Sequence, residues 1–471
     1  MSSLSRRGFL RRGAVLAGGL CALPSRMLHG NSAPSQRITV GIIGTGLMGS
    51  GHVRRLAEDA TVEVLAVCDV DADRRRKAQA TVEQIYARRM PEGGHRACAA
   101  YNDYRQLLAR NDIDAVLIAS CDHWHALQAV DAARAGKDIY CEKPVSITVA
   151  EGREIVQAVR RYGRVFQTGT QYRSIPVIRR VCQFVREGHL GKVKAVFTIL
   201  DPVRTFIGAP RFQPYAAYIG AESDRRRYTP LEVSLPAEPV PEGLDWDLWV
   251  GPAPWRPYNR LYHVNPSPGV VPWSFCDGFG VVAVTWHLSH STDVIQWALG
   301  MEQSGPVELL HPADGPYPTL TCRYANGTLL HFVDNWNTVA ELYQAIPRHV
   351  RLGGLFGGVF VGERGWITSM STGGPIQGGP PDVLREARLP GSDVIIGTND
   401  HHANWLECVR SRRQPSCDEE LGHRSASVGH LALIAHRLGR SLRWDPVAEC
   451  FPDDPAANRL LARAMRQPWR I

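Results

Sequence analysis

The chain has 471 residues, of which 44% are hydrophobic and 21% charged, and its formal net charge is +8. This length is too great for one ordinary core and predicts two domains with extensions, and the composition is typical of a soluble globular protein. Residues 1–34 hold five arginines and no acid, so most of the net charge lies there and gives no reason to expect a nucleic-acid partner.

Residues 1–34 are predicted to be a targeting segment. Residues 5–10 read Ser-Arg-Arg-Gly-Phe-Leu, a twin-arginine pattern, and the weakly apolar residues 14–23 follow. That apolar run is too short to form a stable transmembrane helix. We therefore predict export by the twin-arginine pathway to the periplasm, with the cleavage point left open. A basic, disordered tail is the alternative.

Residues 35–148 are predicted to form a dinucleotide-binding Rossmann domain. The apolar run 37–43 is typical of a buried parallel strand, and Gly44-Thr45-Gly46-Leu47-Met48-Gly49 follows it, before a helix predicted at 50–56. Gly44 allows a tight turn, Gly46 leaves room for a pyrophosphate, and Gly49 lets helix and strand pack closely. The free N–H groups at the helix start attract phosphates. A chance match in a turn-rich chain is the alternative.

A second strand, residues 62–68, ends at Asp69, about twenty residues after Gly49. A carboxylate there can accept hydrogen bonds from the ribose hydroxyls and repel a 2′-phosphate. The sequence therefore predicts NAD as the cofactor. Arg74, Arg75 and Arg76 leave room for NADP, because one of them could meet the additional phosphate.

Strand-like and helix-like runs alternate to about residue 145, with strands at 114–120 and 137–141, a helix at 126–135, and a loop at 95–100. This pattern predicts a doubly wound α/β sheet. Glu142-Lys143-Pro144 follows the last strand directly. It predicts that the Lys143 amine lies at the nicotinamide end of the dinucleotide. A surface lysine ahead of a turn proline is the alternative.

Residues 149–445 are predicted to form a second domain of α+β type, and residues 446–471 a C-terminal tail. We expect helices at 150–162, 175–187, 402–410 and 422–438, and strands at 165–169 and 192–200. Residues 319–324 and 328–333 form the clearest hairpin, with Gly327 in its turn. Residues 201–280 read as a long irregular excursion, and the glycine-rich residues 353–379 as a loop over the sheet.

Ten of the eleven cysteines lie outside the targeting segment, and none forms a Cys-x-x-Cys motif. Folding in a reducing compartment before export predicts free, mostly buried thiols and no disulfide framework. His401-His402 is a candidate metal pair, but no acids stand at matching spacing. We therefore predict that the chain has no metal site.

The glycine loop, Glu142-Lys143-Pro144 and a later His290-x-x-Asp293 together resemble the glucose–fructose oxidoreductase / inositol dehydrogenase (Gfo/Idh/MocA) family over residues 37–471. The strings at 122–125, 169–174, 245–252 and 404–469 are also similar to it, and specifically to its exported, twin-arginine subgroup. The resemblance implies a Rossmann domain followed by an open, mainly antiparallel sheet domain, with the active site between them. It also implies a homo-oligomer, a dimer or tetramer, built on the open sheet face.

By this resemblance Lys143 binds the substrate hydroxyl beside the nicotinamide. An ammonium group there stabilises the alkoxide that develops as hydride leaves carbon, and its protons serve acid–base chemistry. Tyr172 and Arg173 are the implied substrate contacts. The implied cofactor contacts, besides the glycine loop and Asp69, are Ser120, His123, His125, Glu142, Lys143 and Pro144.

The catalytic dyad departs from the family pattern Asp-x-Gly-x-His-x-x-Asp. His290 aligns, and we predict it to be a general base because imidazole titrates near neutral pH. Asp293 also aligns, as part of the substrate site. Trp286 replaces the first aspartate, so the orienting carboxylate is lost unless another acid such as Asp277 reaches in. Trp286 would narrow the sugar site, and His287 is a further candidate, although packing within a helix is the alternative for either histidine.

Two more features leave alternatives open. Ser120-Cys121 replaces the usual Thr-Pro before Asp122, which we expect to alter the loop near the cofactor without loss of binding. Aromatic faces suit sugar C–H surfaces, so the four aromatic residues of the excursion either contact sugar or staple the loop to its own domain. They are Trp246, Trp249, Trp255 and Tyr258.

The resulting hypothesis is an NAD(P)-dependent oxidoreductase that transfers hydride between nicotinamide and a hydroxyl-bearing carbon of a sugar, cyclitol or sugar acid. NAD is scarce outside the cytoplasm, so an exported enzyme would hold its cofactor tightly and recycle it. That constraint also favours an alternative, an NAD-dependent glycosidase or epimerase with transient redox and no net cofactor turnover. A non-catalytic sugar-binding paralogue is the third reading.

Overall fold

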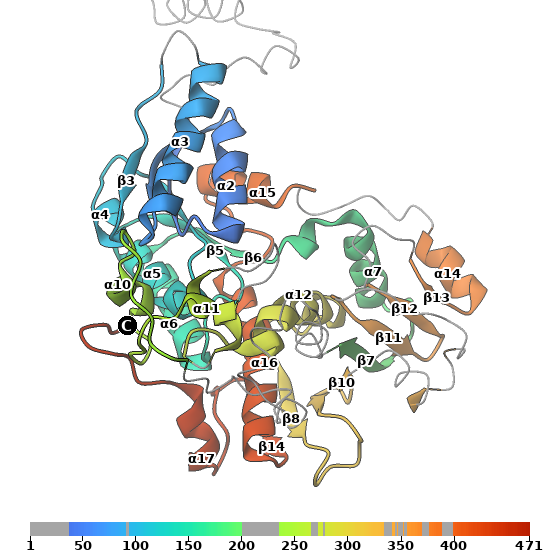
Figure 1. The fold of residues 1–471 in the computed structure, drawn as a ribbon. Coiled ribbons are helices and arrows are strands. Elements are labelled where there is room, and N and C mark those ends of the chain that lie inside the picture. The colour runs from blue at the N-terminus through green and yellow to red at the C-terminus, as the bar shows by residue number, and fades with distance from the viewer. Residues whose placement is uncertain are drawn as a thin grey trace, which may run out of the picture.

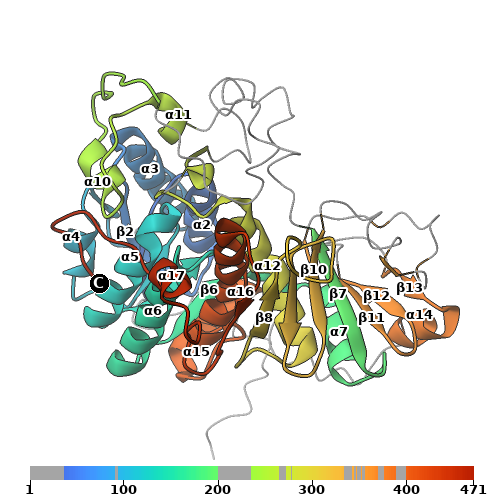
Figure 2. The ribbon, with the colours of Figure 1, turned by 90° about the horizontal axis from the view of Figure 1, so that it is seen from below.

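The computed structural model describes two sheets joined by long helices (Figure 1). It describes residues 37–90, 94–199, 235–264, 272–276, 278–333, 342, 343, 346, 352, 356–369, 376–388 and 399–471. The predicted targeting segment and residues 201–234 lie outside this part of the chain. In the turned view of Figure 2 the first sheet and its helices lie on the left and the second sheet on the right, with α12 and α16 between them.

The first sheet is parallel and six-stranded, with the order β3-β2-β1-β4-β5-β6. Its apolar strands are buried on both faces, as in doubly wound folds. The short edge strand β3 falls at the end of the predicted loop 95–100, where the sequence shows too little periodicity to reveal it. The strands are β1 (Ile38–Ile43), β2 (Val62–Cys68), β3 (Ala99–Tyr101), β4 (Ala115–Ile118), β5 (Asp138–Glu142) and β6 (Phe166–Gly169).

Helices cover both faces of this sheet. One hydrophobic cluster joins the sheet to α2 (Leu47–Glu58), α3 (Ala72–Arg89) and, from far along the chain, α15 (His401–Ser411). A second cluster joins the other face to α4 (Tyr104–Leu108), α5 (Asp122–Arg134) and α6 (Val149–Tyr162). Trp405 of α15 is fully buried in the first cluster. The first sheet is therefore completed by a helix from the C-terminal part of the chain.

The second sheet has eight strands in the order β13-β12-β11-β7-β10-β9-β8-β14. Every neighbouring pair is antiparallel except β7 and β10, which are parallel, so the predicted mainly antiparallel sheet is confirmed. The predicted hairpin is present as β9 and β10. The strands are β7 (Val193–Ile199), β8 (Pro306–Leu310), β9 (Thr321–Tyr324), β10 (Leu329–Val333), β11 (Val359–Gly362), β12 (Trp366–Thr368), β13 (Gly378–Gly379) and β14 (Leu442–Arg443).

Residues 353–379 were expected to loop over the sheet, and the described part of them corrects this. The segment supplies β11, β12 and β13, because Val359, Phe360 and Val361 are buried on the sheet and pair with β7. A glycine lies in the β11–β12 turn: Gly365 has φ +150°, and a Cβ there would come within 2.0 Å of the Gly379 carbonyl oxygen. The glycines mark turns and close approaches rather than a structureless loop.

Helices pack on one face of the second sheet in the largest core cluster (Figure 2). Leu288, Val294 and Ile295 of α12 and Val428 and Leu431 of α16 are among its fully buried residues. The remaining helical segments are η3 (Gln171–Ser174), α7 (Pro176–Arg186), α10 (Trp246–Val250), α11 (Arg260–His263), η6 (Pro272–Phe275), α12 (Val282–Leu299), α14 (Pro381–Arg388), α16 (Glu419–Leu438), α17 (Pro455–Asn458) and η7 (Arg459–Leu461).

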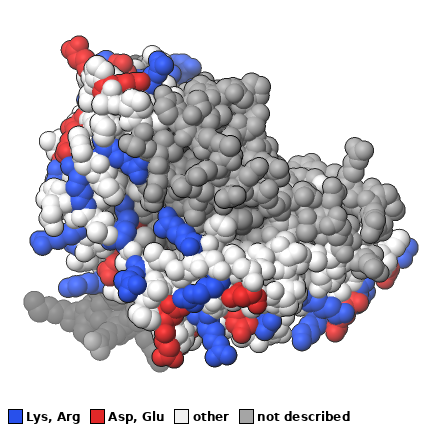
Figure 3. Space-filling model, turned by 60° about the horizontal axis from the view of Figure 1, so that its bottom comes forward, with Lys and Arg blue, Asp and Glu red and all other residues white. Residues whose placement is uncertain are grey.

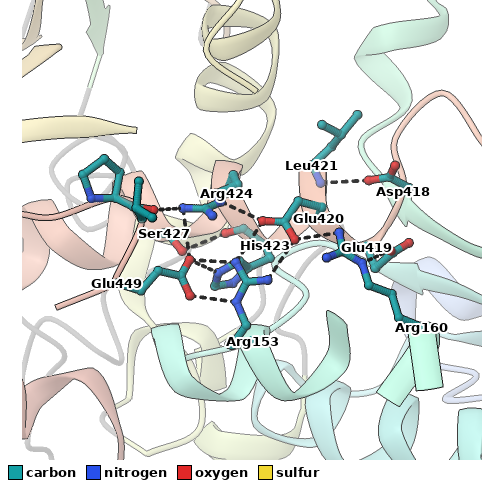
Figure 4. Close-up of polar contacts among 12 residues, drawn as sticks. Arg153, Arg160, Asp418, Glu419, Glu420, Leu421, His423, Arg424, Ser427 and Glu449 are labelled. Atoms are coloured by element: carbon teal, nitrogen blue, oxygen red, sulfur yellow. Dashed lines mark hydrogen bonds and ion pairs between the residues drawn. The ribbon is translucent and has the colours of Figure 1, made fainter. Parts of the chain in front are cut away.

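An ion-pair network joins α6 to α16 (Figure 4). The Arg153 guanidinium donates to both oxygens of Glu420 at 2.8 Å and to both oxygens of Glu449 at 2.7 and 2.9 Å. Arg160 also donates to Glu420 at 2.8 Å, and His423 lies 2.6 Å from Glu449. Bidentate arginine–carboxylate contacts fix geometry as well as charge. The network therefore fixes α6, which covers the first sheet, against α16, which packs on the second.

Two boundaries predicted from the sequence are corrected by these contacts. The first sheet includes β6, so its folding unit extends to Gly169 rather than ending at residue 148. Residues 446–471 are not a detached tail, because Trp469 packs edge-on against Trp124 of α5, at 4.8 Å between ring centroids. Arg463 also donates to Glu151 at 2.6 Å. Residues near the start of the predicted second domain and in the predicted tail thus contact the first sheet or its helices.

The surface visible in Figure 3 mixes basic and acidic side chains over its described part. The ten cysteines in the described ranges are free, and eight of them are buried, as expected for thiols that serve as small apolar side chains. Among the described helices, none is long and apolar enough to cross a membrane.

Candidate active site

A cavity of about 290 Å³ opens at the carboxyl ends of the parallel strands. It lies where β1 and β4 are neighbours and the strand order reverses, which is the usual ligand position in doubly wound sheets. Gly44 and Gly46 line one part of it, and Glu142, Lys143 and His290 line another. The glycine loop, the Glu-Lys-Pro turn and the candidate base therefore share one cavity.

The glycine loop has the geometry that its sequence predicts. Gly44 has φ +85°, and a Cβ there would lie 2.5 Å from the Ser120 amide nitrogen. A Cβ on Gly49 would lie 1.9 Å from the Gly44 carbonyl oxygen, so this glycine is needed for close packing. A Cβ on Gly46 would meet nothing nearer than Arg74 at 3.6 Å, which leaves its backbone open to the cavity. These residues fit a pyrophosphate at the start of α2.

Leu47 and Met48 begin α2 and also line the cavity, with exposed fractions of 40% and 50%. Thr45 does not line it. Its amide and hydroxyl donate instead to one oxygen of Asp69, at 2.8 and 3.0 Å. Thr45 and Gly49 thus shape the loop, whereas Gly44, Gly46, Leu47 and Met48 face the space that a dinucleotide would fill.

Asp69 lies at the end of β2 and lines the cavity beside Arg74. Its second oxygen, Oδ1, accepts from the Asp71 amide at 3.0 Å and retains one lone pair for a ribose hydroxyl, whereas both lone pairs of Oδ2 are taken by Thr45. Of the three arginines considered for a 2′-phosphate, only Arg74 lines the cavity. Arg75 donates to the Asp69 carbonyl and to Asn102, and Arg76 pairs with Asp73 on the surface.

Glu142 ends β5 and is 4% exposed. It accepts from Gln171 at 2.7 Å and from the Lys143 amide at 3.2 Å, and His52 lies 3.0 Å away. Burial alone would raise the pKa of Glu142, but the hydrogen bond from His52 and the neighbouring positive charges outweigh it and lower this pKa to about 2. Glu142 is therefore a carboxylate at neutral pH.

Lys143 lines the cavity next to Glu142. Burial disfavours its ammonium form and lowers its pKa below the ordinary value, while the charges of Glu142 and Asp122 oppose that shift. A lysine whose pKa is lowered gives up a proton more readily than an exposed lysine does. Pro144 does not line the cavity, and its carbonyl oxygen lies 2.7 Å from His125.

Asp122 is a cavity residue to which the sequence analysis assigned no role. It opens α5, is 1% exposed, and its Oδ2 atom has no hydrogen-bond partner among the described residues. Burial raises the pKa of this carboxyl well above its ordinary value, against the opposing charge of Lys143. The sequence signal was its position immediately after the β4 loop. It brings a second carboxyl to the lysine side of the cavity.

His290, on α12, is 7% exposed and lines the cavity. Its ring stacks on Tyr172, with 4.4 Å between centroids and 18° between planes, and meets Phe356 edge-on. Burial raises the pKa of Tyr172 to about 12, so this phenol stays neutral. Tyr172 thus orients the candidate base and does not itself line the cavity.

Ser120 and His125 both line the cavity. The Ser120 hydroxyl donates to Gln128 at 2.7 Å, and His125 bridges the Ser120 and Pro144 carbonyl oxygens at 3.0 and 2.7 Å. His125 therefore ties the β4–α5 loop to the turn that carries Lys143. Burial lowers the pKa of His125 below its ordinary value.

His123, a predicted cofactor contact, lies away from the cavity. It does not line the cavity, and its ring nitrogens lie 3.1 and 3.0 Å from the carbonyl oxygens of Phe279 and Trp249. Residues two positions apart on a helix point to different sides. The side chain of His123 therefore faces the irregular segment 201–280, while that of His125 faces the cavity. Burial lowers the pKa of His123 to about 3.

Arg173 and Asp293, two predicted substrate-site residues, bind each other. Arg173 donates to Asp293 at 2.7 Å and to Glu302 at 2.9 Å, and Asp293 is fully buried and accepts from Ser425 at 3.1 Å. Neither residue lines the cavity. This pair positions α12 behind His290, and the substrate role predicted for Arg173 stays a prediction.

Several other expectations concern positions outside the described part. The backbone of Trp286 and His287 belongs to α12, but their side chains lie outside the described part of the chain, as does Asp277. Their expected roles stay predictions. Among the described residues no group of three or more His, Cys, Asp or Glu side chains could hold a metal ion.

The aromatic residues of the excursion mainly staple it. Trp246 and Trp249 stack at 4.6 Å with 13° between planes, both 4% exposed, in a cluster with Tyr258 and Phe279. Trp249 reaches the cavity wall, whereas Trp255 is 55% exposed and lies under Arg466. Most of these four aromatic residues therefore pack the irregular segment onto itself, as the second of the two alternatives predicted.

Comparison with known proteins agrees with this fold. Residues 38–170 match the model described as "Oxidoreductase family, NAD-binding Rossmann fold", and residues 224–330 and 393–471 match "Oxidoreductase family, C-terminal alpha/beta domain". Fold and cavity define an oxidoreductase of the NAD-binding Rossmann class. The chain belongs to the Gfo/Idh/MocA family.

Curated relatives match over part of the chain. Inositol 2-dehydrogenase of Salmonella paratyphi B is 34% identical over 157 residues, which is 33% of this chain and 43% of the relative. The rhizopine catabolism protein MocA of Rhizobium meliloti is 31% identical over 160 residues, 34% of this chain and 46% of the relative. A glycosyl hydrolase family 109 protein of Shewanella pealeana is 29% identical over 174 residues, 34% of this chain and 37% of the relative. Each match spans less than half of the relative.

Solved structures share the fold at low identity. The WlbA dehydrogenase of Bordetella pertussis, in complex with NADH and UDP-GlcNAcA, has a TM-score of 0.52 and 15% identity, covering 87% of this chain and 99% of its own. Levoglucosan dehydrogenase, in complex with NADH and L-sorbose, has a TM-score of 0.52 and 16% identity with the same coverage. At this identity the likeness concerns the fold alone.

Proposed function

We propose that this chain catalyses NAD-dependent transfer of hydride between nicotinamide and a hydroxyl-bearing carbon of a sugar, cyclitol or sugar acid. The observation that carries the proposal is the single cavity shared by Gly44, Gly46, Asp69, Lys143 and His290. Relatives named as inositol dehydrogenases, and a neighbour bound to L-sorbose, support a polyhydroxylated substrate.

The residues on the lysine side have distinct tasks in this proposal. Bound NAD supplies the hydride acceptor. Lys143 holds the substrate oxygen and stabilises negative charge on it. His290, oriented by its stack on Tyr172, handles the hydroxyl proton together with the Lys143 amine. Asp122 places a second buried carboxyl on the lysine side of the cavity.

The cofactor is proposed to be NAD, because the Asp69 carboxylate faces the cavity. The Asp69→Asn variant keeps an acceptor for Thr45 and removes the charge that repels a 2′-phosphate. We expect the ratio of NAD to NADP affinity to fall about tenfold, measured by fluorescence titration with each cofactor. The matched control is Asp73→Asn on the exposed side of α3. Equal weakening of both cofactors would mean that Asp69 only shapes the glycine loop.

The proposed activity is tested first by what the protein retains. Native mass spectrometry of protein purified without added nucleotide is expected to show the mass of one NAD per chain. A panel of cyclitols, aldoses and sugar acids is then screened for reduction of that cofactor by absorbance. A protein that binds no NAD when NAD is added in excess would contradict the proposal.

A second candidate is an NAD-dependent glycosidase or epimerase with transient redox. The glycosyl hydrolase family 109 relative favours it, and Trp286 stands where the family places its first aspartate. A tightly held cofactor that ends unchanged also suits an exported enzyme. Release of a cleaved or epimerised sugar with no accumulated NADH would select this candidate over net dehydrogenation.

Two further properties are proposed from the sequence. The twin-arginine pattern at residues 5–10 supports export to the periplasm, which fractionation of cells expressing the full chain would check. The family resemblance supports a homo-oligomer built on the second sheet, which light scattering would check. A carbohydrate is the proposed small-molecule partner.

A further inference from the structure

A chain of hydrogen-bonding groups runs from the active-site cavity to a partly exposed residue. Glu142 lines the cavity, and its Oε1 atom lies 3.0 Å from Nε2 of His52. The other ring nitrogen of His52, Nδ1, lies 2.9 Å from Nε2 of His402. His52 is 5% exposed and His402 is partly exposed. We propose that Glu142, His52 and His402 form a proton relay between Lys143 and solvent.

The proposal rests on the proposed dehydrogenation, which requires such a route. Oxidation of a carbinol sends two electrons and one proton to the cofactor as hydride, and the hydroxyl proton must leave separately. That proton passes from the hydroxyl to the Lys143 amine and then to the Glu142 carboxylate. The Glu142 O–H donates to His52 Nε2, His52 Nδ1–H donates to His402 Nε2, and His402 Nδ1–H releases a proton to water. One proton enters and one leaves.

The three groups come from separate elements that hold them in register. His52 is on α2, Glu142 ends β5, and His402 is in the first turn of α15. Tyr140 packs against both rings: His402 stacks on it at 5.0 Å and 11°, and His52 meets it edge-on at 5.7 Å. Gln171 donates to both the Tyr140 hydroxyl and Glu142, at 2.8 and 2.7 Å. Tyr140 and Gln171 thus fix the positions of the two imidazole rings and of the Glu142 carboxylate.

The outer end is held by α15 itself. Asp400 caps that helix by accepting from the His402 and Ala403 amides at 3.0 and 3.1 Å, and it pairs with Arg55 of α2. Burial, together with the charge of His52, lowers the pKa of His402 to about 3. A neutral imidazole can accept on one nitrogen while it donates from the other, which conduction requires.

The proposed relay also suits an enzyme that reduces its bound cofactor and then oxidises it again without releasing it. When a proton passes toward solvent, each imidazole ends with its proton on Nε2 instead of Nδ1. A proton that passes in the reverse half-reaction restores both rings to their first state. An enzyme that oxidises and then reduces would reset this relay in each cycle without rotation of either buried ring.

The test uses three variants of the full chain. His402→Ala opens space at a partly exposed position for imidazole from the buffer. His52→Gln keeps a donor toward Glu142 but cannot pass a proton on. His189→Ala is the matched control, because His189 is partly exposed beside Glu187 and Glu386 and is remote from the cavity. NAD affinity is measured for all of them by fluorescence titration.

Single-turnover NADH formation is followed with the substrate identified in the screen. We expect the rate to fall about tenfold in His402→Ala and in His52→Gln, with NAD affinity unchanged. Imidazole in the buffer should restore His402→Ala and leave the other variants unaffected. An unchanged rate in His402→Ala, or a loss that imidazole does not rescue, would overturn the relay while leaving the proposed function intact. An unmodified protein that neither binds NAD nor forms NADH would overturn both.

A second measurement needs no turnover. In protein labelled with ¹⁵N-histidine, one N–H proton should correlate with both His52 Nδ1 and His402 Nε2. The signal should be present in His189→Ala and missing from the other two variants. Absence of any shared proton in the unmodified protein would overturn the proposal, since the two rings would then not be hydrogen-bonded.

Discussion

Replacing Lys143 by methionine is expected to lower kcat about a thousandfold while the affinity for NAD stays nearly unchanged. Methionine fills similar space but cannot hold the substrate oxygen, stabilise negative charge on it or carry a proton. Both oxidation and the reverse reduction should fall together, because the same group acts on the oxygen in each direction. Steady-state kinetics with the substrate from the screen give kcat, and fluorescence titration gives the NAD dissociation constant.

The matched control for this variant is Lys77→Met, on the exposed side of α3. It removes the same charge from the surface and should leave kcat unchanged. If Lys143→Met kept its activity, the ammonium would have no part in the chemistry, and the site would have to be sought elsewhere. If it instead lost NAD affinity with kcat intact, Lys143 would be a cofactor contact only.

Replacing Glu420 by glutamine is expected to lower the free energy of unfolding by about 3 kcal/mol at pH 7. Glu420 accepts from Arg153, Arg160 and Arg424, so removing its charge leaves three guanidinium groups facing a neutral amide. Because the network joins α6 to α16 (Figure 4), we expect a lower melting temperature and a less cooperative transition. Thermal denaturation followed by circular dichroism measures both.

The effect of Glu420 should depend on pH in a defined direction. Burial raises the pKa of Glu420, but the hydrogen bonds from Arg153 and Arg424 outweigh it and lower this pKa from 4.5 to about 2. A carboxyl with a lowered folded-state pKa stabilises the protein above its unfolded pKa, and this contribution is lost as the pH falls toward 2. The difference between the variant and the unmodified protein should therefore shrink below about pH 4.

The control for Glu420→Gln is Glu407→Gln. Glu407 is on α15, and its half-exposed carboxylate pairs with Arg413. Surface pairs contribute between about 0 and 1 kcal/mol, so its melting temperature should barely change. A pH-independent loss in Glu420→Gln would point to packing rather than charge. A loss no greater than that of Glu407→Gln would show that the network does not hold the two parts together.

Local sequence patterns were enough to predict the first part of the molecule. The glycine loop, Asp69 and Lys143 each follow a buried strand, and parallel strands end at one edge, so residue order and spacing alone indicate that they meet. The strand β6 was predicted as an element but assigned to the wrong side of the domain boundary. Strand membership in a sheet depends on pairing with distant residues, which an apolar run does not encode.

The substrate side was predicted less well, and His123, Arg173 and Asp293 show why. His123 and His125 are both on α5 and differ in the direction of their side chains. Which of the two faces the cavity depends on how the helix is rotated about its axis, and the sequence does not show this. Arg173 and Asp293 are 120 residues apart, and nothing local reveals that they bind each other. A charged residue in a family motif can serve catalysis or a buried ion pair equally well.

The sequence alone determined the dinucleotide loop, the lysine that follows β5 and the family, because these depend on residue type and short spacing. Only the tertiary structure decided that α15 returns to the first sheet and brings His402 to His52, and that Asp122 lies buried at the lysine end of the cavity. The physical reason is that these contacts join residues on different elements of the fold, up to 350 residues apart in the case of His52 and His402. Burial sets both the pKa of each group and its hydrogen-bond partners, and it exists only once the chain has folded.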